Sequence, residues 1–148
     1  MNQISKEIIE CFDGGGKLLI CGNGGSASMS NHFAAELVCS FENKKRRPLP
    51  AISLCANQSI LTAWSNDFSF KGVFSRQLEA LGNPGDLLIT LSTSGASQNV
   101  IDAEFKAHDM CIEVIDFPRK GKGTAQIQEY QLRLMHKICR EVEKAMFP

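Results

Sequence analysis

The chain has no surplus of charge of either sign and no long apolar run. Sixteen Lys and Arg residues balance 16 Asp and Glu residues among 148. A polyanion binder needs a basic surplus to release counterions, so this balance argues against a nucleic-acid partner. No apolar run approaches the roughly 18 residues that span a bilayer, and residues 1–6 lack the basic-then-apolar pattern of a secretion signal. We therefore expect a cytoplasmic protein with no membrane partner.

Paired cysteines are also missing. No two of the six cysteines are separated by two residues, as zinc-binding thiols often are, and their spacing fits no compact disulfide framework. Several lie inside apolar stretches such as residues 18–21, so we interpret them as small hydrophobic residues in a reducing compartment. With 43% hydrophobic residues, the composition and length predict one folded domain over residues 1–148.

Short apolar runs alternate with helical patterns. The runs predict buried parallel strands at residues 17–21, 51–55, 86–91 and 111–115. Apolar spacing predicts six helices: residues 4–12, a helix from the first loop to about residue 41, residues 60–64, residues 71–81, a helix after residue 97, and residues 124–146. Thr124 is the predicted N-cap of the last helix. The polar residues 65–67 predict a turn. This alternation predicts an α/β sandwich around a parallel sheet, with every strand-to-helix loop at one edge.

Two of these loops are rich in glycine and hydroxyl groups. Residues 22–28 follow the first strand, and residues 92–97 follow the third. Glycine lets backbone N–H groups approach a ligand, and a helix N-terminus favours an anion. The second loop carries four hydroxyls, on Ser92, Thr93, Ser94 and Ser97. This density of uncharged donors predicts a site for one phosphate group; tight turns with helix caps and nothing bound are the structural alternative.

Nucleotide-binding patterns fit these loops poorly. Gly22, Gly24 and Ala27 match the loose dinucleotide fingerprint, but the second strand ends at residues 55–57 without an acidic residue for a ribose hydroxyl. The chain contains no Gly-Lys-Ser or Gly-Lys-Thr, so the Walker pattern is absent. A single phosphate therefore remains the favoured ligand group.

Ionisable and amide side chains share faces of two predicted helices. His32 and Glu36 lie four residues apart, where both can reach one ligand; an ordinary surface pair is the alternative. Gln128 and His136 lie eight residues apart on the last helix, about 80° and 12 Å from one another. Convergence on one atom would stretch both side chains, and His136 taken alone also fits a core histidine.

The runs Cys21–Ser26 and His32–Leu37 resemble the sugar isomerase (SIS) domain family, most closely its phosphoheptose isomerase branch. The resemblance extends from about residue 15 to 146. Supporting segments occur in the same order at Pro50–Ser53, Ser65–Phe68, Phe74–Arg76, Gly85–Leu88, Ser92–Ile101 and Ile127–Glu129. The resemblance implies a flavodoxin-like three-layer α/β sandwich. Because the sequence after Asp116 is about a strand shorter than in family members, we expect a sheet of four strands, with five as the alternative.

The resemblance also implies roles for individual residues. Glu36 corresponds to the family's catalytic base and His136 to its catalytic acid/base. The ligands of one zinc ion per subunit correspond to His32, Glu36, Gln128 and His136. The substrate contacts correspond to Asn23, Gly24, Gly25, Ser26, Asp67, Ser92, Thr93, Ser94, Ser97 and Gln128.

Further expectations concern assembly and departures from the family. Members are homotetramers with active sites between subunits, so the resemblance implies a homotetramer here. Members also begin with a longer N-terminal helical segment, and they carry an aspartate where this chain has Ala125 and an arginine where it has Ser40. These departures concern substrate positioning and rate rather than the type of reaction.

The implied activity is isomerisation of the ketose sedoheptulose 7-phosphate to the aldose D-glycero-D-manno-heptose 7-phosphate through an enediol, in the biosynthesis of heptose precursors of lipopolysaccharide core. Two alternatives use the scaffold without turnover: a SIS module that binds the replication initiator protein, and a sugar-phosphate sensor. The initiator-binding relative resembles residues 49–54 and 61–63 but lacks counterparts of Glu36 and His136. Because this chain has both, we expect an enzyme.

Overall fold

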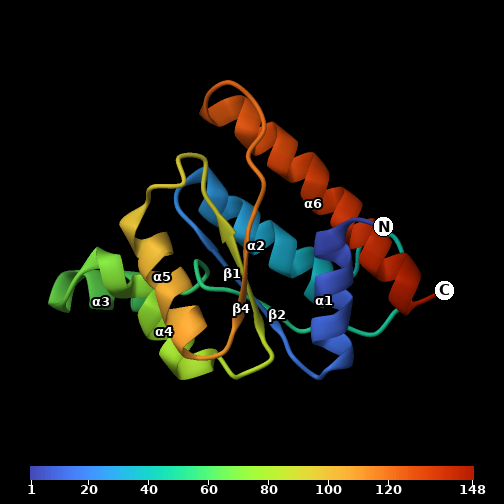
Figure 1. Cartoon of the computed structure of the whole chain (residues 1–148), viewed down its shortest axis with the longest axis horizontal. Helices are drawn as coiled ribbons and strands as arrows, with labels where there is room; N and C mark the ends of the chain where they lie inside the picture. The colour runs from blue at the N-terminus through green and yellow to red at the C-terminus, as the bar shows by residue number, and fades with distance from the viewer.

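Four parallel strands form the centre of the computed structural model, which describes residues 1–148 (Figure 1). They lie in the order β2-β1-β3-β4, with bounds β1 Leu18–Gly22, β2 Ala51–Ser53, β3 Leu87–Leu91 and β4 Glu113–Asp116. The two central strands end together, because Gly22 of β1 is paired with Leu91 of β3. The four-stranded α/β sandwich expected from the sequence is confirmed, and the two loops rich in hydroxyl groups emerge side by side.

Helices cover both faces of the sheet, and strand residues alternate between two cores. Leu18 and Ile20 pack with the first helical layer, whereas Leu19 and Cys21 pack with the second. The first layer consists of α1 (Gln3–Asp13), α2 (Gly25–Val38) and α6 (Thr124–Met146). The second contains α4 (Val73–Leu81) and α5 (Gln98–Asp109), with α3 (Gln58–Asp67) and the 3₁₀ helix η1 (Phe70–Gly72) beside them. Figure 1 shows the two layers on either side of the strands.

Two helix ends differ from the sequence-based expectation. The first loop's helix, α2, ends at Val38 rather than near residue 41. The backbone N–H groups of residues 41–43 bond instead to the Glu143 carboxylate of α6, a contact between distant segments that local spacing does not reveal. At the start of α6, the N-cap is Gly123 with φ 83°, and Thr124 is the first helical residue. Thr124 therefore does not act as the predicted cap.

The segment between β2 and α4 also differs from its prediction. Residues 65–67 continue α3 instead of forming a turn, since the helical bond from Phe68 N–H to the Trp64 carbonyl is kept and the two rings stack 4.2 Å apart. The predicted helix at 71–81 is divided into η1 and α4. Gly72 lies at this division against the Trp64 indole, where an added Cβ would lie 2.6 Å from the ring nitrogen.

No helix in the structure combines the length and the apolar character needed to cross a membrane.

Candidate functional site

The loops after β1 and β3 enclose a hollow of about 250 Å³ at the carboxyl edge of the sheet. All the predicted substrate contacts except Asp67 line it, together with Leu91 and Thr124. None of the lining residues is ionisable, so the hollow offers hydroxyl, amide and backbone donors. The structure thus brings the residues of the two loops into one pocket, which we call the hydroxyl pocket.

Hydrogen bonds within and between the loops fix the residues that line this pocket. The backbone of Gly24 has φ 58°, and no side chain caps the N-terminus of α2 that follows it. The side chains of Asn23 and Asn99 exchange two amide hydrogen bonds of 2.8 and 2.9 Å, which join the first loop to α5. The hydroxyls of Ser92 and Ser94 accept bonds from backbone N–H groups of their own loop. The Thr93 hydroxyl makes no hydrogen bond within the chain and is available to a ligand.

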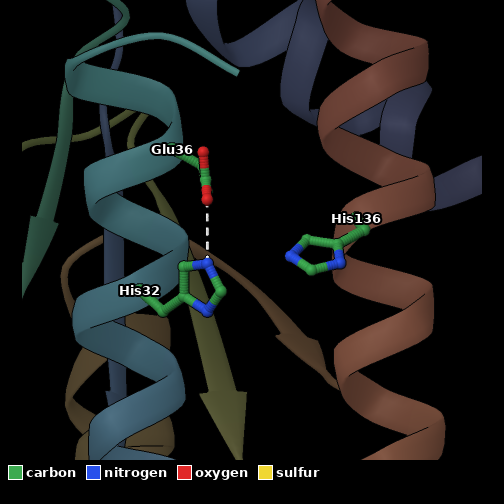
Figure 2. Close-up of side chains that lie close together, drawn as sticks. All are labelled: His32, Glu36 and His136. Carbon is green, nitrogen blue, oxygen red and sulfur yellow. Dashed lines mark hydrogen bonds and ion pairs between the residues drawn. The ribbon is translucent and has the colours of Figure 1, made fainter. Parts of the chain in front are cut away.

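Three ionisable side chains meet between α2 and α6 (Figure 2). His32 Nε2 lies 2.8 Å from Glu36 Oε1 along α2, and the His136 ring faces them from α6. The two imidazole rings are 5.3 Å apart in an edge-to-face arrangement. One nitrogen of each imidazole and a Glu36 oxygen all lie within 4.8 Å of one another. We call this group the His–Glu–His cluster; it forms within a single chain.

A second hollow adjoins the pocket and reaches the cluster at His32. It has a volume of about 390 Å³ and lies between α2 and α6. Its lining contains the ionisable His32 and Glu129 as well as the apolar Met29, Ala125 and Leu132. Gly25 and Gln128 line both hollows. Gly25 lets the Gln128 side-chain amide lie close to the backbone, and a Cβ at that position would displace the amide. Gln128 therefore lies between the hydroxyl pocket and His32.

Neighbouring side chains define the surroundings of His136. The Phe41 ring stacks on the His136 ring with centroids 5.5 Å apart, and the Arg140 guanidinium lies 5.6 Å from the Phe41 centroid. Burial, with a smaller effect of the nearby Glu36 charge, raises the pKa of Cys139 to about 12. This thiol is buried and protonated at neutral pH, so it is not a competing thiolate in the cluster.

The cluster has the donor set of a metal site. Two imidazole nitrogens and a carboxylate oxygen within 4.8 Å of one another are donors that can hold a divalent ion. Without a metal, the same three groups can accept, donate and hold protons around a carbonyl compound.

Comparison with known proteins assigns the family. A model of the SIS domain matches residues 1–117. A phosphoheptose isomerase from Synechocystis sp. is 47% identical over 156 residues, which cover 95% of this chain and 80% of the relative. Another from Roseiflexus sp. is 42% identical over 160 residues, which cover 97% of this chain and 81% of the relative. The chain belongs to the phosphoheptose isomerase branch of the SIS domain family.

Solved structures agree with this family membership. A phosphoheptose isomerase from Francisella tularensis superimposes on this SIS-domain chain with a TM-score of 0.92 at 32% identity. One from Neisseria gonorrhoeae gives a TM-score of 0.89 at 36% identity. Each alignment covers 96% of this chain and 84% of the other. These solved structures therefore share the fold of this chain over nearly all of its length.

One predicted site residue of this SIS domain lies elsewhere in the chain. Asp67 is exposed at the C-terminal end of α3, accepts a hydrogen bond from Asn66 and lines neither hollow. Three contributions were missed from the sequence: Thr124 lines the hydroxyl pocket, Phe41 stacks on His136, and Asn99 pairs with Asn23. For Thr124, its place at the first turn of a helix carrying Gln128 was a usable signal; the other two contacts depend on long-range packing.

Proposed function

We propose that this SIS-domain chain is a phosphoheptose isomerase that converts sedoheptulose 7-phosphate to D-glycero-D-manno-heptose 7-phosphate through an enediol. The observation that carries the proposal is that an uncharged, hydroxyl-lined pocket adjoins a hollow beside Gln128, which reaches the His–Glu–His cluster at His32. The relatives at 42% and 47% identity bear the name of this activity.

Binding begins with the phosphate in the hydroxyl pocket. The Ser and Thr hydroxyls of residues 92–97, together with Ser26, supply neutral donors, and the uncapped N-terminus of α2 favours an anion. The sugar then extends past Gln128 towards His32, which brings its first two carbons to Glu36 and His136. Fixing the substrate at its far end in this way supplies the orientation that proton transfer requires.

Proton transfer uses the two groups that face each other across α2 and α6. The Glu36 carboxylate removes a proton from C1 of the ketose, and the electron pair of that C–H bond forms the C1–C2 double bond of the enediol. His136 gives a proton to the C2 oxygen and takes the proton from the C1 hydroxyl. Return of a proton to C2 produces the aldehyde at C1, so the substrate and product are isomers and no redox partner is needed.

The proposed cofactor is one zinc ion per subunit, held by His32, Glu36, Gln128 and His136. Two imidazoles and a carboxylate form a nitrogen and oxygen donor set that suits zinc. The Gln128 amide would have to reach the ion from about two turns before His136 on α6. When bound, zinc would polarise the substrate carbonyl as a Lewis acid. Within the chain itself, the bond of 2.8 Å between His32 and Glu36 already fixes the Glu36 carboxylate, an oxygen of which lies within 4.8 Å of a His136 nitrogen.

The proposed assembly is a cytoplasmic homotetramer with active sites between subunits, which acts in the supply of heptose for lipopolysaccharide core. The position of Asp67 supports an active site formed by two subunits. Asp67 lines neither hollow of its own chain, and α3, which carries it, has no buried residue. In such an assembly a neighbouring subunit would supply Asp67 to the sugar. Light scattering of the purified protein measures the subunit number, and a monomer that is fully active would contradict this part of the proposal.

The decisive experiment is a coupled assay on sedoheptulose 7-phosphate, carried out with and without a chelator. Turnover by the wild-type chain supports the isomerase. Tight binding of the sugar phosphate without turnover would instead favour the sensor, and capture of the replication initiator protein without turnover would favour the binding module. The adjacency of Glu36 and His136 favours the enzyme over the sensor and the binding module, because binding alone does not require a pair of groups that transfer protons.

A further inference from the structure

A buried ion pair lies two turns of α6, about 10 Å, beyond His136 and on the same face of that helix. Arg46 Nε donates to Glu143 Oε2 at 2.6 Å, and the two side chains are 1% and 6% exposed. Arg46 belongs to the loop after α2, and Glu143 to α6. Neither residue lines the hydroxyl pocket or the hollow beside His32, and the proposed chemistry uses neither.

Arg46 closes the end of the helix that carries Glu36. Its guanidinium donates to the backbone carbonyl of Leu37 at 2.8 Å and also to the carbonyl of Glu36 itself. The last carbonyl groups of an α-helix have no partner within the helix, so an outside donor fixes the conformation of that turn. Arg46 therefore holds the backbone from which the Glu36 carboxylate extends.

Glu143 holds the segment that covers His136. Its carboxylate accepts the backbone N–H groups of Phe41 at 3.1 Å, Glu42 at 2.8 Å and Asn43. Burial by itself raises the pKa of Glu143, but the hydrogen bonds from Arg46 and these three amides outweigh burial and hold the pKa below its usual value. The charged carboxylate thus fixes the loop on which the Phe41 ring stacks against His136.

We infer that the Arg46–Glu143 pair is a positioning device for proton transfer, which sets Glu36 and the Phe41 ring relative to His136. The inference rests on the proposed isomerase function and extends it to residues outside the pocket. Both arms act through the backbone, so loss of the pair displaces the reacting groups and leaves the phosphate contacts in place. Displacement of a catalytic group by about 1 Å lowers a rate by roughly 10²-fold.

The chain offers a matched control where β1 and β3 begin. Asp86 is also buried, at 4% exposure, and binds Lys17 Nζ at 2.6 Å. It likewise accepts backbone N–H groups, those of Lys17 at 3.0 Å and Asn83 at 2.7 Å. In both pairs, a buried carboxylate binds a basic side chain and backbone N–H groups, so loss of either carboxylate should lower the stability of the fold. Lys17–Asp86, however, lies at the start of β1 and β3, away from the His–Glu–His cluster.

The first test compares kcat and KM of Glu143→Gln with those of Asp86→Asn, both at a temperature where each variant is folded. We expect Glu143→Gln to lower kcat by about tenfold or more while KM stays within about twofold, since a displaced catalytic group slows the reaction without touching the phosphate site. Asp86→Asn should lower the melting temperature with kcat unchanged. An unchanged kcat in Glu143→Gln, or an equal loss in both variants, would overturn the inference.

A second pair of variants decides the question where Glu143→Gln does not fold. Phe41 is only half-buried, so Phe41→Leu keeps apolar volume while removing the ring that stacks on His136. We expect Phe41→Leu to lower kcat by about fivefold with KM unchanged, and Phe41→Tyr, which keeps the ring, to retain the wild-type kcat. Wild-type turnover by Phe41→Leu contradicts the proposed arrangement.

The histidine ring signals in an NMR spectrum separate this inference from the proposed function. The chain has only three histidines, and His108 is exposed on α5, so its signal is an internal reference. Glu143→Gln and Phe41→Leu should shift the His136 ring protons, whereas Asp86→Asn should not. A wild-type chain without turnover refutes the isomerase but leaves this readout intact. Unshifted His136 signals refute the positioning device whether or not the chain turns over substrate.

Discussion

The two ends of the α2–α6 interface contain opposite kinds of chemistry. The hydroxyl pocket near Gln128 has no ionisable side chain, whereas the cluster near His136 consists of ionisable side chains alone. A phosphate held by neutral donors adds no protein charge near the reacting carbons, so the cluster can move protons without a competing ion pair. Because α6 is a continuous helix over Thr124–Met146, one rigid element sets the distance between binding and chemistry.

The largest expected effect comes from Glu36→Gln, which removes the base and keeps the shape of the side chain. We expect kcat to fall by about 10²- to 10⁴-fold, the usual contribution of a positioned general base. The fold and the affinity for inorganic phosphate should be retained, as measured by circular dichroism and calorimetry. Wild-type turnover in Glu36→Gln would show that proton transfer does not depend on the His–Glu–His cluster.

Removal of a metal ligand should have the next largest effect. His32→Ala takes away one donor of the cluster, and we expect the zinc content of the purified protein to fall well below one per chain. Activity should fall by about 10²-fold and recover poorly when zinc is added. His108→Ala is the matched control, since His108 is exposed on α5 outside the cluster. Equal zinc content in both variants would contradict the ligand assignment.

A change in the hydroxyl pocket should be smaller and should appear in KM. Thr93→Val replaces a hydroxyl that makes no hydrogen bond within the chain by a methyl group of similar size. Loss of one hydrogen bond to a charged phosphate costs about 1.5 kcal/mol, which raises KM about tenfold with kcat nearly unchanged. Thr62→Val, on the exposed surface of α3, should leave both constants unchanged. A fall in kcat alone in Thr93→Val would show that the hydroxyl pocket does not act only in binding.

The smallest effect concerns acid stability, which should depend on Glu143 and not on the pocket. The folded-state pKa of Glu143 lies below its value of 4.5 in the unfolded chain. Its contribution is therefore present above pH 4.5 and is lost as the pH falls through the folded-state pKa, with a slope of at most about 1.4 kcal/mol per pH unit. Urea unfolding at a series of pH values should show this loss in wild type and Thr93→Val, and a reduced loss in Glu143→Gln.

Much of the fold could be predicted because it depends on local patterns. Strands buried on both faces need continuous apolar runs, and parallel connection then places the loops after β1 and β3 at one edge. The pairing of His32 with Glu36 follows in the same way from helical spacing. The end of α2 at Val38 could not be predicted, because it is Glu143, about a hundred residues further along the chain, that binds the N–H groups of residues 41–43.

Local sequence was enough to specify the alternation of strands and helices, the shared edge of the two hydroxyl-bearing loops and the face occupied by His32 and Glu36. These features depend on neighbours a few residues apart, where backbone geometry leaves few options. Tertiary packing alone brought the His136 ring against Glu36, laid Phe41 over it and carried Asp67 away from both hollows. Contacts of that kind arise when separate helices dock on the sheet, and the docking depends on the shapes of all the buried side chains together.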